Sequence, residues 1–548
     1  MPEQLHGHLH GLGVSPGRTA GPVHAMGAPP VLPADVPAPG PDEAERAAKA
    51  LQFVATSLDE LAARVTGPAA EVLATQAMMA ADMTLADAVA AKVAAGRPAA
   101  WAITDAIADQ QATFAELGGY FAERSADLAD LRDRAVAWLL DVPMPGLPRP
   151  GVPYVLVADD LSPADTALLD DSVRAIVTRR GGPTSHTAIL ARARGLPAVV
   201  GCAGILDVTD GTTVSVDGTT GAVAVVTPSE AAEIVAAGQA ERARNAALTG
   251  PGRTADGVAV PLLQNVGGAA DLAPDGEGVG LFRTEFLFLG RTTAPPVAEQ
   301  ETAYRELFEA AGDNKVVLRT LDAGADKPLP FLGLAEEDNP ALGVRGLRTS
   351  RVDPSVLAEQ LEAVSRAASA TTADVWVMAP MVATASEAEE FAAAVHKAGL
   401  RTAGVMIEVP AAALKARQIL AAVDFVSIGT NDLSQYTMAA DRMNGELADL
   451  LDPWQPAVLE LVALVASAGQ ELGKPVGVCG EAASDPLLAC VFVGMGVTTL
   501  SMSAPSVPAV RAALATRTTD DCKRLAGLAL SAPTAEAARK AVAEERVQ

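Results

Sequence analysis

The strongest constraint on the fold lies in the last three hundred or so residues, where short β-like runs alternate with longer helical patterns. Eight runs rich in apolar and β-branched residues occur at 258–266, 278–282, 315–321, 375–379, 403–407, 425–428, 475–478 and 498–501. Most are separated by stretches with helical periodicity. Eight strand–helix units in a segment of this length predict a (β/α)8 barrel.

Polar residues recur at one end of these runs. The positions at or just beyond a carboxyl end are Arg283, Arg319, Glu408, Asn431, Asp432 and Cys479. The carboxyl ends of barrel strands converge on one mouth, where the active sites of such barrels are built. So regular a placement is not expected of unrelated salt bridges or packing residues, and it predicts a site at the mouth.

The residue types at this mouth suit a phosphorylated acid. Arg283 and Arg319 can form bidentate pairs with phosphate or carboxylate oxygens. Glu408 and Asp432 are oxygen ligands of the kind that Mg²⁺ prefers. The thiol of Cys479 can give up or take a proton, and Asn431 and Arg442 add a neutral donor and a further cation.

The first half of the chain has a different organisation. Proline-rich stretches at 29–41 and 143–150 bracket helical patterns at about 42–67, 69–94, 98–124 and 126–141, which predict a helical bundle. Short strand patterns follow. We therefore expect an α/β domain (1–35 and 145–228), an inserted helical subdomain (36–144), a linker helix (229–250) and the barrel domain (251–548).

One histidine stands out in the α/β domain. His186 lies in the run GGPTSHTAILAR, Gly181 to Arg192, after a glycine pair and between two hydroxyl residues. A lone histidine of this kind is more often structural than catalytic. The barrel mouth offers two arginines that could clamp a phosphate group (the clamp arginines, Arg283 and Arg319), a metal site and an acid, but no obvious nucleophile. This favours His186 as a phosphoryl acceptor.

Composition excludes several other classes of protein. The 548 residues carry 41 Lys and Arg against 67 Asp and Glu, a net charge of −26, which argues against nucleic-acid binding. The four cysteines are too sparse for a disulfide framework or a zinc site. Because no apolar run reaches transmembrane length and no signal peptide is recognised, we expect a cytoplasmic protein without membrane insertion. The terminal His6, His8 and His10 are more consistent with a disordered end than with a metal site.

Several motifs together resemble one family over nearly the whole length. They include GLGVSPG (from Gly11), SPADTALL, GGPTSHTAILAR, GLFRTEFLF, VVLRTLDAGADK, NPALGVRGLR, VMIEVPAAA, SIGTNDLSQYTMAADR and GVCGEAASDP. These segments resemble enzyme I of the bacterial phosphoenolpyruvate-dependent sugar phosphotransferase system. The resemblance implies a swivelling phosphohistidine domain with an inserted helical bundle, followed by a (β/α)8 barrel.

The resemblance also implies residue roles. His186 would be phosphorylated on Nε2 by phosphoenolpyruvate, with release of pyruvate, and would pass the group to the carrier protein HPr as the first step of sugar uptake. Glu408 and Asp432 would bind Mg²⁺, and Cys479 would be the proton donor. Phosphoenolpyruvate would be bound by Arg283, Arg319, Asn431, Asp432 and Arg442, with Arg345 nearby. HPr would dock on the helical subdomain, and the barrel would form a homodimer.

One departure and two alternatives remain at this stage. Family members often carry Phe-Glu-x-His where this chain has Leu73-Ala74-Thr75-Gln76, which affects carrier docking or helix packing. A pyruvate phosphate dikinase or phosphoenolpyruvate synthase would need an ATP-grasp domain for which the chain has no room. A catalytically silent regulatory paralogue would not need intact His186, Cys479 and clamp residues.

Overall fold

The computed structural model describes residues 8–63, 68–117, 125–161, 165, 169–182, 185–273, 276–288, 291–324, 329–335, 337–442, 444 and 447–545. The described chain divides into two compact units. One unit comprises residues 20–179 and 204–214, and the other comprises residues 8–19, 180–203 and 215 onward.

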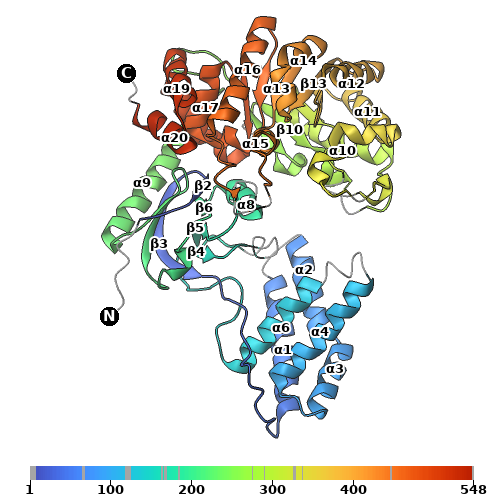
Figure 1. The fold of residues 1–548 in the computed structure, drawn as a ribbon, viewed down its shortest axis with the longest axis vertical. Coiled ribbons are helices and arrows are strands. Elements are labelled where there is room, and N and C mark those ends of the chain that lie inside the picture. Colours follow the sequence, from blue (N-terminus) through green and yellow to red (C-terminus); the bar gives the residue numbers. More distant parts are fainter. Residues whose placement is uncertain are drawn as a thin grey trace. The chain divides into compact units, whose positions relative to one another are not determined.

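The first unit contains the predicted helical bundle, whose helices lie side by side in Figure 1. They are α1 (Glu43–Ala62), α2 (Pro68–Ala80), α3 (Met83–Ala94), α4 (Ala99–Leu117) and α6 (Ser125–Leu140). One face of α1 is apolar and buried at Ala47, Leu51, Val54 and Leu58. The bundle core therefore forms where helical periodicity placed it.

The expected single helix over 69–94 is wrong, because α2 and α3 are separate helices. The side chain of Asp82 accepts a hydrogen bond of 2.7 Å from the backbone N–H of Thr84 and caps α3. The apolar pattern continues through this break, which hid it in the sequence. In the departing stretch, Leu73 and Gln76 are buried in the bundle, so these two residues contribute to helix packing.

The predicted strands of the α/β region are present. In the first unit β3 (Arg18–Ala25), β4 (Tyr154–Ala158) and β5 (Val173–Thr178) pair in parallel. In the second unit β1 (Leu9–His10) pairs with β8 (Ala222–Val225), and β2 (Leu12–Ser15) pairs with β6 (Ala198–Val200), both antiparallel. The remaining elements are β7 (Thr213–Asp217), α8 (His186–Arg194) and the long helix α9 (Pro228–Ala247).

The barrel prediction is confirmed, because eight parallel strands close in the order β10-β11-β12-β13-β14-β15-β16-β9. Their bounds are β9 (Leu262–Val266), β10 (Gly278–Arg283), β11 (Lys315–Arg319), β12 (Asp374–Ala379), β13 (Thr402–Ile407), β14 (Phe425–Ile428), β15 (Val476–Val478) and β16 (Thr499–Met502). The first predicted run, 258–266, becomes a strand only after Pro261, which has no N–H for a ladder.

Helices cover the outside of the barrel (Figure 1). They are α10 (Val297–Ala311), α11 (Pro354–Ser369), α12 (Ala385–Lys397), α13 (Pro410–Leu414), α14 (Ala416–Ala422), α15 (Thr430–Met438), α16 (Pro456–Leu472), α17 (Pro486–Met495), α18 (Val507–Ala515), α19 (Thr519–Ser531) and α20 (Ala535–Glu544). Among the described residues, no helix is both long enough and apolar enough to span a bilayer.

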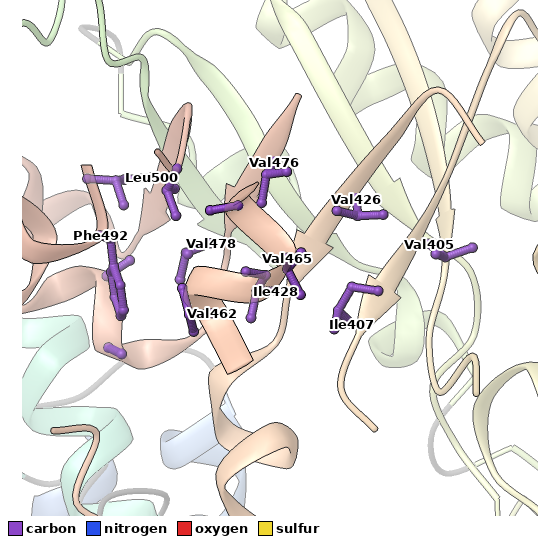
Figure 2. Close-up of a cluster of buried hydrophobic side chains, with 14 of the residues drawn as sticks. Val405, Ile407, Val426, Ile428, Val462, Val465, Val476, Val478, Phe492 and Leu500 are labelled. Carbon is purple, nitrogen blue, oxygen red and sulfur yellow. The ribbon is translucent and has the colours of Figure 1, made fainter. Parts of the chain in front are cut away.

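Side chains along each strand point alternately to the outside and to the inside of the barrel. Outward residues such as Val478 and Ile428 lie beside Val462 and Val465 of α16 in Figure 2. Val405, Ile407 and Val426 belong to the same buried cluster. A second, inner cluster contains Leu281, Val317, Met378, Met406, Phe425 and Cys479. Successive side chains of a strand point to opposite faces, so the position of a residue along its strand determines whether it lies inside the barrel.

Candidate active site

Four of the predicted site residues continue the inward alternation to the barrel mouth. Arg283 lies two positions after the inner residue Leu281, and Arg319 lies two after Val317. Glu408 follows Met406 in the same way, and Cys479 itself belongs to the inner cluster. The strand pattern thus places two cations, one carboxylate and one thiol on the inner side of the mouth.

The two clamp arginines are held by different carboxylates. Arg319 is 8 % exposed, and its Nη2 lies 2.9 Å from Glu285 Oε1 and its Nη1 3.0 Å from Asp322 Oδ2. Burial opposes its charge, but these two carboxylates raise the pKa of Arg319 above its ordinary value. The Arg283 side chain is 32 % exposed, and its Nη2 lies 3.3 Å from Glu481 Oε1. Arg319 is therefore fixed, whereas Arg283 reaches toward solvent.

Asp432, on α15, is the centre of a second charge network. Its Oδ1 lies 3.1 Å from Nη1 of the fully buried Arg345, and its Oδ2 lies 3.5 Å from Nη1 of Arg442. Arg345 also contacts Asp322, with 3.2 Å between its Nη2 and Asp322 Oδ1. Arg345, which the sequence placed near the substrate, thus joins the α15 carboxylate to the carboxylate that holds Arg319.

Glu408 is buried beside other carboxylates. Burial, followed by the charges of Asp432 and Asp322, raises the pKa of Glu408 to about 8. Its Oε2 accepts a hydrogen bond of 2.8 Å from the backbone N–H of Met381. A Cβ at Gly429 would lie 2.7 Å from Glu408 Oε1, so a side chain at this position would displace the Glu408 carboxylate. A cation placed among these carboxylates would relieve their mutual repulsion.

Cys479 lies directly after β15 with 2 % of its surface exposed. Burial raises the pKa of its thiol to about 11. The side chain of Asn265 donates a hydrogen bond of 3.0 Å to the Cys479 carbonyl and fixes the backbone there. The residue is therefore a protonated thiol at neutral pH, held at the inner end of the mouth.

His186 is the first residue of α8, and its side chain lies outside the described residues. Ser185 caps the helix, since its side chain accepts a hydrogen bond of 3.2 Å from the Ala188 N–H. Ala188 and Ala191 are buried, while Ile189 is 42 % exposed. These residues position the backbone of His186 at a capped helix N-terminus, after the left-handed Gly181 (φ 107°).

One carboxylate connects α8 with the barrel mouth. Glu481 Oε2 lies 2.8 Å from Arg192 Nη1, while Glu481 Oε1 contacts Arg283. The Glu481 N–H also donates a hydrogen bond of 3.2 Å to the side-chain oxygen of Asn431. A pocket at this place is lined by Arg192, Asn431, Arg442 and Glu481, among other residues.

The structure brings the predicted residues of the mouth together, and it adds others that the sequence analysis missed. Glu285, Asp322 and Glu481 each pair with a predicted arginine, and Arg192 joins α8 to Glu481. A signal was present, because Glu285 lies two residues after Arg283 and Glu481 lies two after Cys479. Residues that closely follow the carboxyl ends of barrel strands lie at the same mouth, whether or not they continue the strand.

Comparison with protein families agrees with this architecture. Residues 241–519 match the family described as PEP-utilising enzyme, PEP-binding domain. Residues 151–221 match its mobile domain, and residues 10–124 match its N-terminal domain. A closed parallel barrel with an arginine- and carboxylate-lined mouth, joined to these regions, defines a phosphoenolpyruvate-utilising enzyme.

Similar curated proteins show which kind of phosphoenolpyruvate-utilising enzyme the chain resembles. A phosphoenolpyruvate-protein phosphotransferase of Streptomyces coelicolor is 52% identical over 97% of this chain and 98% of its own length. One of Haloferax volcanii is 43% identical over 83% of each chain. A multiphosphoryl transfer protein of Xanthomonas campestris is 38% identical over 100% of this chain and 68% of its own. The chain belongs to the phosphoenolpyruvate-protein phosphotransferase family, which confirms the resemblance to enzyme I.

Proposed function

We propose that the chain transfers the phosphoryl group of phosphoenolpyruvate to its own His186, releases pyruvate, and then phosphorylates the carrier protein HPr. The observation that carries this proposal is the mouth itself, where two arginines and a protonated thiol lie at the carboxyl ends of three strands of one barrel, β10, β11 and β15. The helix that begins with His186 contacts the same mouth through Arg192.

In the first half-reaction, Arg283 and Arg319 hold the phosphate and carboxylate groups of the substrate. A neutral His186 ring nitrogen attacks phosphorus in line, a P–N bond forms, and the bond from phosphorus to the enol oxygen breaks. The electron pair of that bond leaves with pyruvate enolate. The Cys479 thiol then protonates the enolate carbon, and the resulting thiolate regains a proton from water. Positioning and charge stabilisation dominate such phosphoryl transfers.

The carboxylates of the mouth fit a magnesium ion. Glu408 and Asp432 are the ligands we propose, and the raised pKa of Glu408 marks a place where a cation would be stabilised. Among the described residues, no group of three acidic, histidine or cysteine side chains could hold a metal ion alone. A two-carboxylate site suits Mg²⁺, which keeps waters and takes substrate oxygens. Bound there, Mg²⁺ would neutralise charge on the phosphate.

The second half-reaction uses the helical subdomain. We propose that HPr docks on the bundle formed by α1, α2, α3, α4 and α6 and takes the phosphoryl group from His186. Homodimer formation through the barrel and an active site completed by Asn431 and Arg442 belong to the same proposal. All four cysteines are free thiols, which supports a reducing compartment such as the cytoplasm.

Phosphorylation with radiolabelled phosphoenolpyruvate and Mg²⁺ tests the proposal directly. We expect about one label per chain in the wild type, transfer of that label to added HPr, and none in His186→Ala, because the acceptor nitrogen is gone. Label in the variant at wild-type stoichiometry would overturn the assignment of His186. A wild type that binds phosphoenolpyruvate without becoming labelled would indicate the silent paralogue, and label unaffected by chelation would remove the metal site.

A further inference from the structure

Glu481 has a position that the proposed reaction leaves unexplained. It is the first residue of a short 3-10 helix (Glu481–Ser484), two residues after Cys479, and its side chain is 16 % exposed. Its two carboxylate oxygens contact two different arginines, Arg192 at 2.8 Å and Arg283 at 3.3 Å. One carboxylate therefore holds a substrate-clamp arginine and the helix of His186 together.

Each arginine has a distinct role. Arg192 lies on α8 six residues after His186, about 9 Å along the helix axis at the usual rise per residue. Its Nε donates a hydrogen bond of 2.6 Å to the Val14 carbonyl, and the side chain is 5 % exposed. Arg283 is more exposed than Arg319, and Arg319 is bound by two other carboxylates. Of these three arginines, Arg283 is the one best able to turn toward a substrate.

The charge of Glu481 must be compensated in every state. Burial acts to raise the pKa of Glu481, but the charges of Arg192 and Arg283 bring it below its ordinary value, so the group is a carboxylate. The Glu481 side chain is largely buried, so leaving its carboxylate without a partner is costly. Glu481 can release Arg283 to a substrate if Arg192 stays, and it can release Arg192 if Arg283 stays. Losing its contacts with Arg192 and Arg283 at the same time is unfavourable for Glu481.

We propose that Glu481 is a positioning residue that couples substrate binding to the docking of the His186 helix. Glu481 releases Arg283 to the substrate and keeps its contact with Arg192. When phosphoenolpyruvate takes Arg283, Arg192 is the arginine that, within the described part of the chain, still compensates the Glu481 carboxylate, and α8 is held more tightly at the mouth. By linkage, a docked α8 makes Arg283 easier to release and tightens substrate binding. This inference rests on the proposed function.

Affinity measurements give the coupling a distinctive signature. Phosphoenolpyruvate is titrated with Mg²⁺ into full-length His186→Ala protein, which binds without turnover. Arg192→Gln should weaken binding by about tenfold, because Arg283 would then be the one charged partner that the described residues leave to the Glu481 carboxylate. Glu481→Gln should leave binding unchanged or tighter, because Arg283 is released. The double variant Arg192→Gln/Glu481→Gln should regain the affinity lost by Arg192→Gln.

Rates separate this role from simple structural damage. In the chain with His186 intact, Glu481→Gln should slow labelling from phosphoenolpyruvate by about 10- to 100-fold, the scale of a lost positioning contact. Exchange of the phosphoryl group between His186 and HPr should stay within about twofold, since that step does not use the barrel mouth. Glu481→Asp should restore part of the labelling rate. Glu299→Gln, which breaks an exposed pair with Arg291, serves as the matched control and should change neither step.

Other outcomes would overturn the inference. Equal loss in both half-reactions, or weaker substrate binding in Glu481→Gln, would show that Glu481 merely supports the fold. A double variant as weak as Arg192→Gln would show that the two residues are not coupled through this carboxylate. The proposed function fails separately, in the wild type, if phosphoenolpyruvate does not label His186 at all.

Discussion

The backbone N–H of Met381 donates a hydrogen bond of 2.8 Å to Glu408 Oε2 from a residue held at φ 59°, in the left-handed region that side chains usually avoid. Strained backbone of this kind persists where the surrounding structure requires it, and it concentrates at functional sites. Here it fixes a buried carboxylate whose pKa is raised by burial and by neighbouring carboxylates. Holding Glu408 in this position therefore lowers the stability of the folded chain.

Glu408→Gln should separate activity from stability. The amide oxygen can still accept the Met381 N–H, but the charge that would bind Mg²⁺ is lost. We expect phosphorylation of His186 to fall by about 10²–10³-fold, as when another charge-stabilising group is removed. The thermal midpoint should rise, because the amide avoids the cost of placing a carboxyl group where burial and the charges of Asp432 and Asp322 oppose its ionisation. A lower midpoint in calorimetry would contradict the view that Glu408 is held at a cost.

The two clamp arginines should respond differently to removal. Arg319→Ala leaves Glu285 and Asp322, which are 5 % and 2 % exposed, without this partner. Breaking a buried pair in this way costs about 3–5 kcal/mol, so both the free energy of unfolding and the activity should fall. Arg283→Ala should cost less than about 1 kcal/mol, the range of a partly exposed pair, yet reduce kcat/KM strongly. Urea unfolding together with labelling kinetics checks both; equal destabilisation would contradict the contrast.

Cys479 should remain a thiol far into the alkaline range. Burial raises its pKa from 9.0 to about 11, so the folded state favours the protonated form. That contribution to stability is fully present below pH 9 and is lost as the pH rises through 11. Iodoacetamide should therefore alkylate Cys479 slowly from pH 7 to pH 10, as followed by peptide mass spectrometry. Rapid alkylation near pH 8 would show that the thiolate is already formed and would remove the acid role.

Gly480→Ala should disrupt the site without touching a charged residue. The added Cβ would lie 2.0 Å from Thr430 Oγ1 and 2.6 Å from Thr430 N, at the start of α15. The start of α15 must then shift, and Asn431 and Asp432 would move with it. We expect at least about a tenfold loss of labelling, the scale of small misplacements at active sites. Gly527→Ala on α19 is the control, since its Cβ would meet nothing within 4 Å.

Much of the fold could be predicted from the sequence, because each barrel strand is marked both by a short apolar run and by a polar residue beyond its carboxyl end. Runs such as 403–407 and 425–428 are short and apolar, and the polar residue after each run marks the carboxyl end. The break at Asp82 was not predictable from periodicity, because apolar residues continue across it. A capping side chain competes with helix continuation only through local hydrogen bonding.

The ion pairs of the site were less predictable than its residue types. Periodicity places Arg319 at the mouth, but its pairing with Glu285 depends on the register of β10 against β11, which contains an irregularity between Val279 and Phe282. The contact of Arg192 with Glu481 joins segments almost three hundred residues apart. No local pattern encodes such a contact, because it depends on how α8 meets the barrel.

The inward alternation of the strands has a consequence for how this chain can change its length. Arg283, Arg319, Glu408 and Cys479 all extend the inner face of their strands by one further step. Deleting or inserting one residue within such a strand would turn the functional side chain toward the helices and an apolar neighbour toward the mouth. Length variation tolerated by this protein should therefore be confined to the connections between strands and helices.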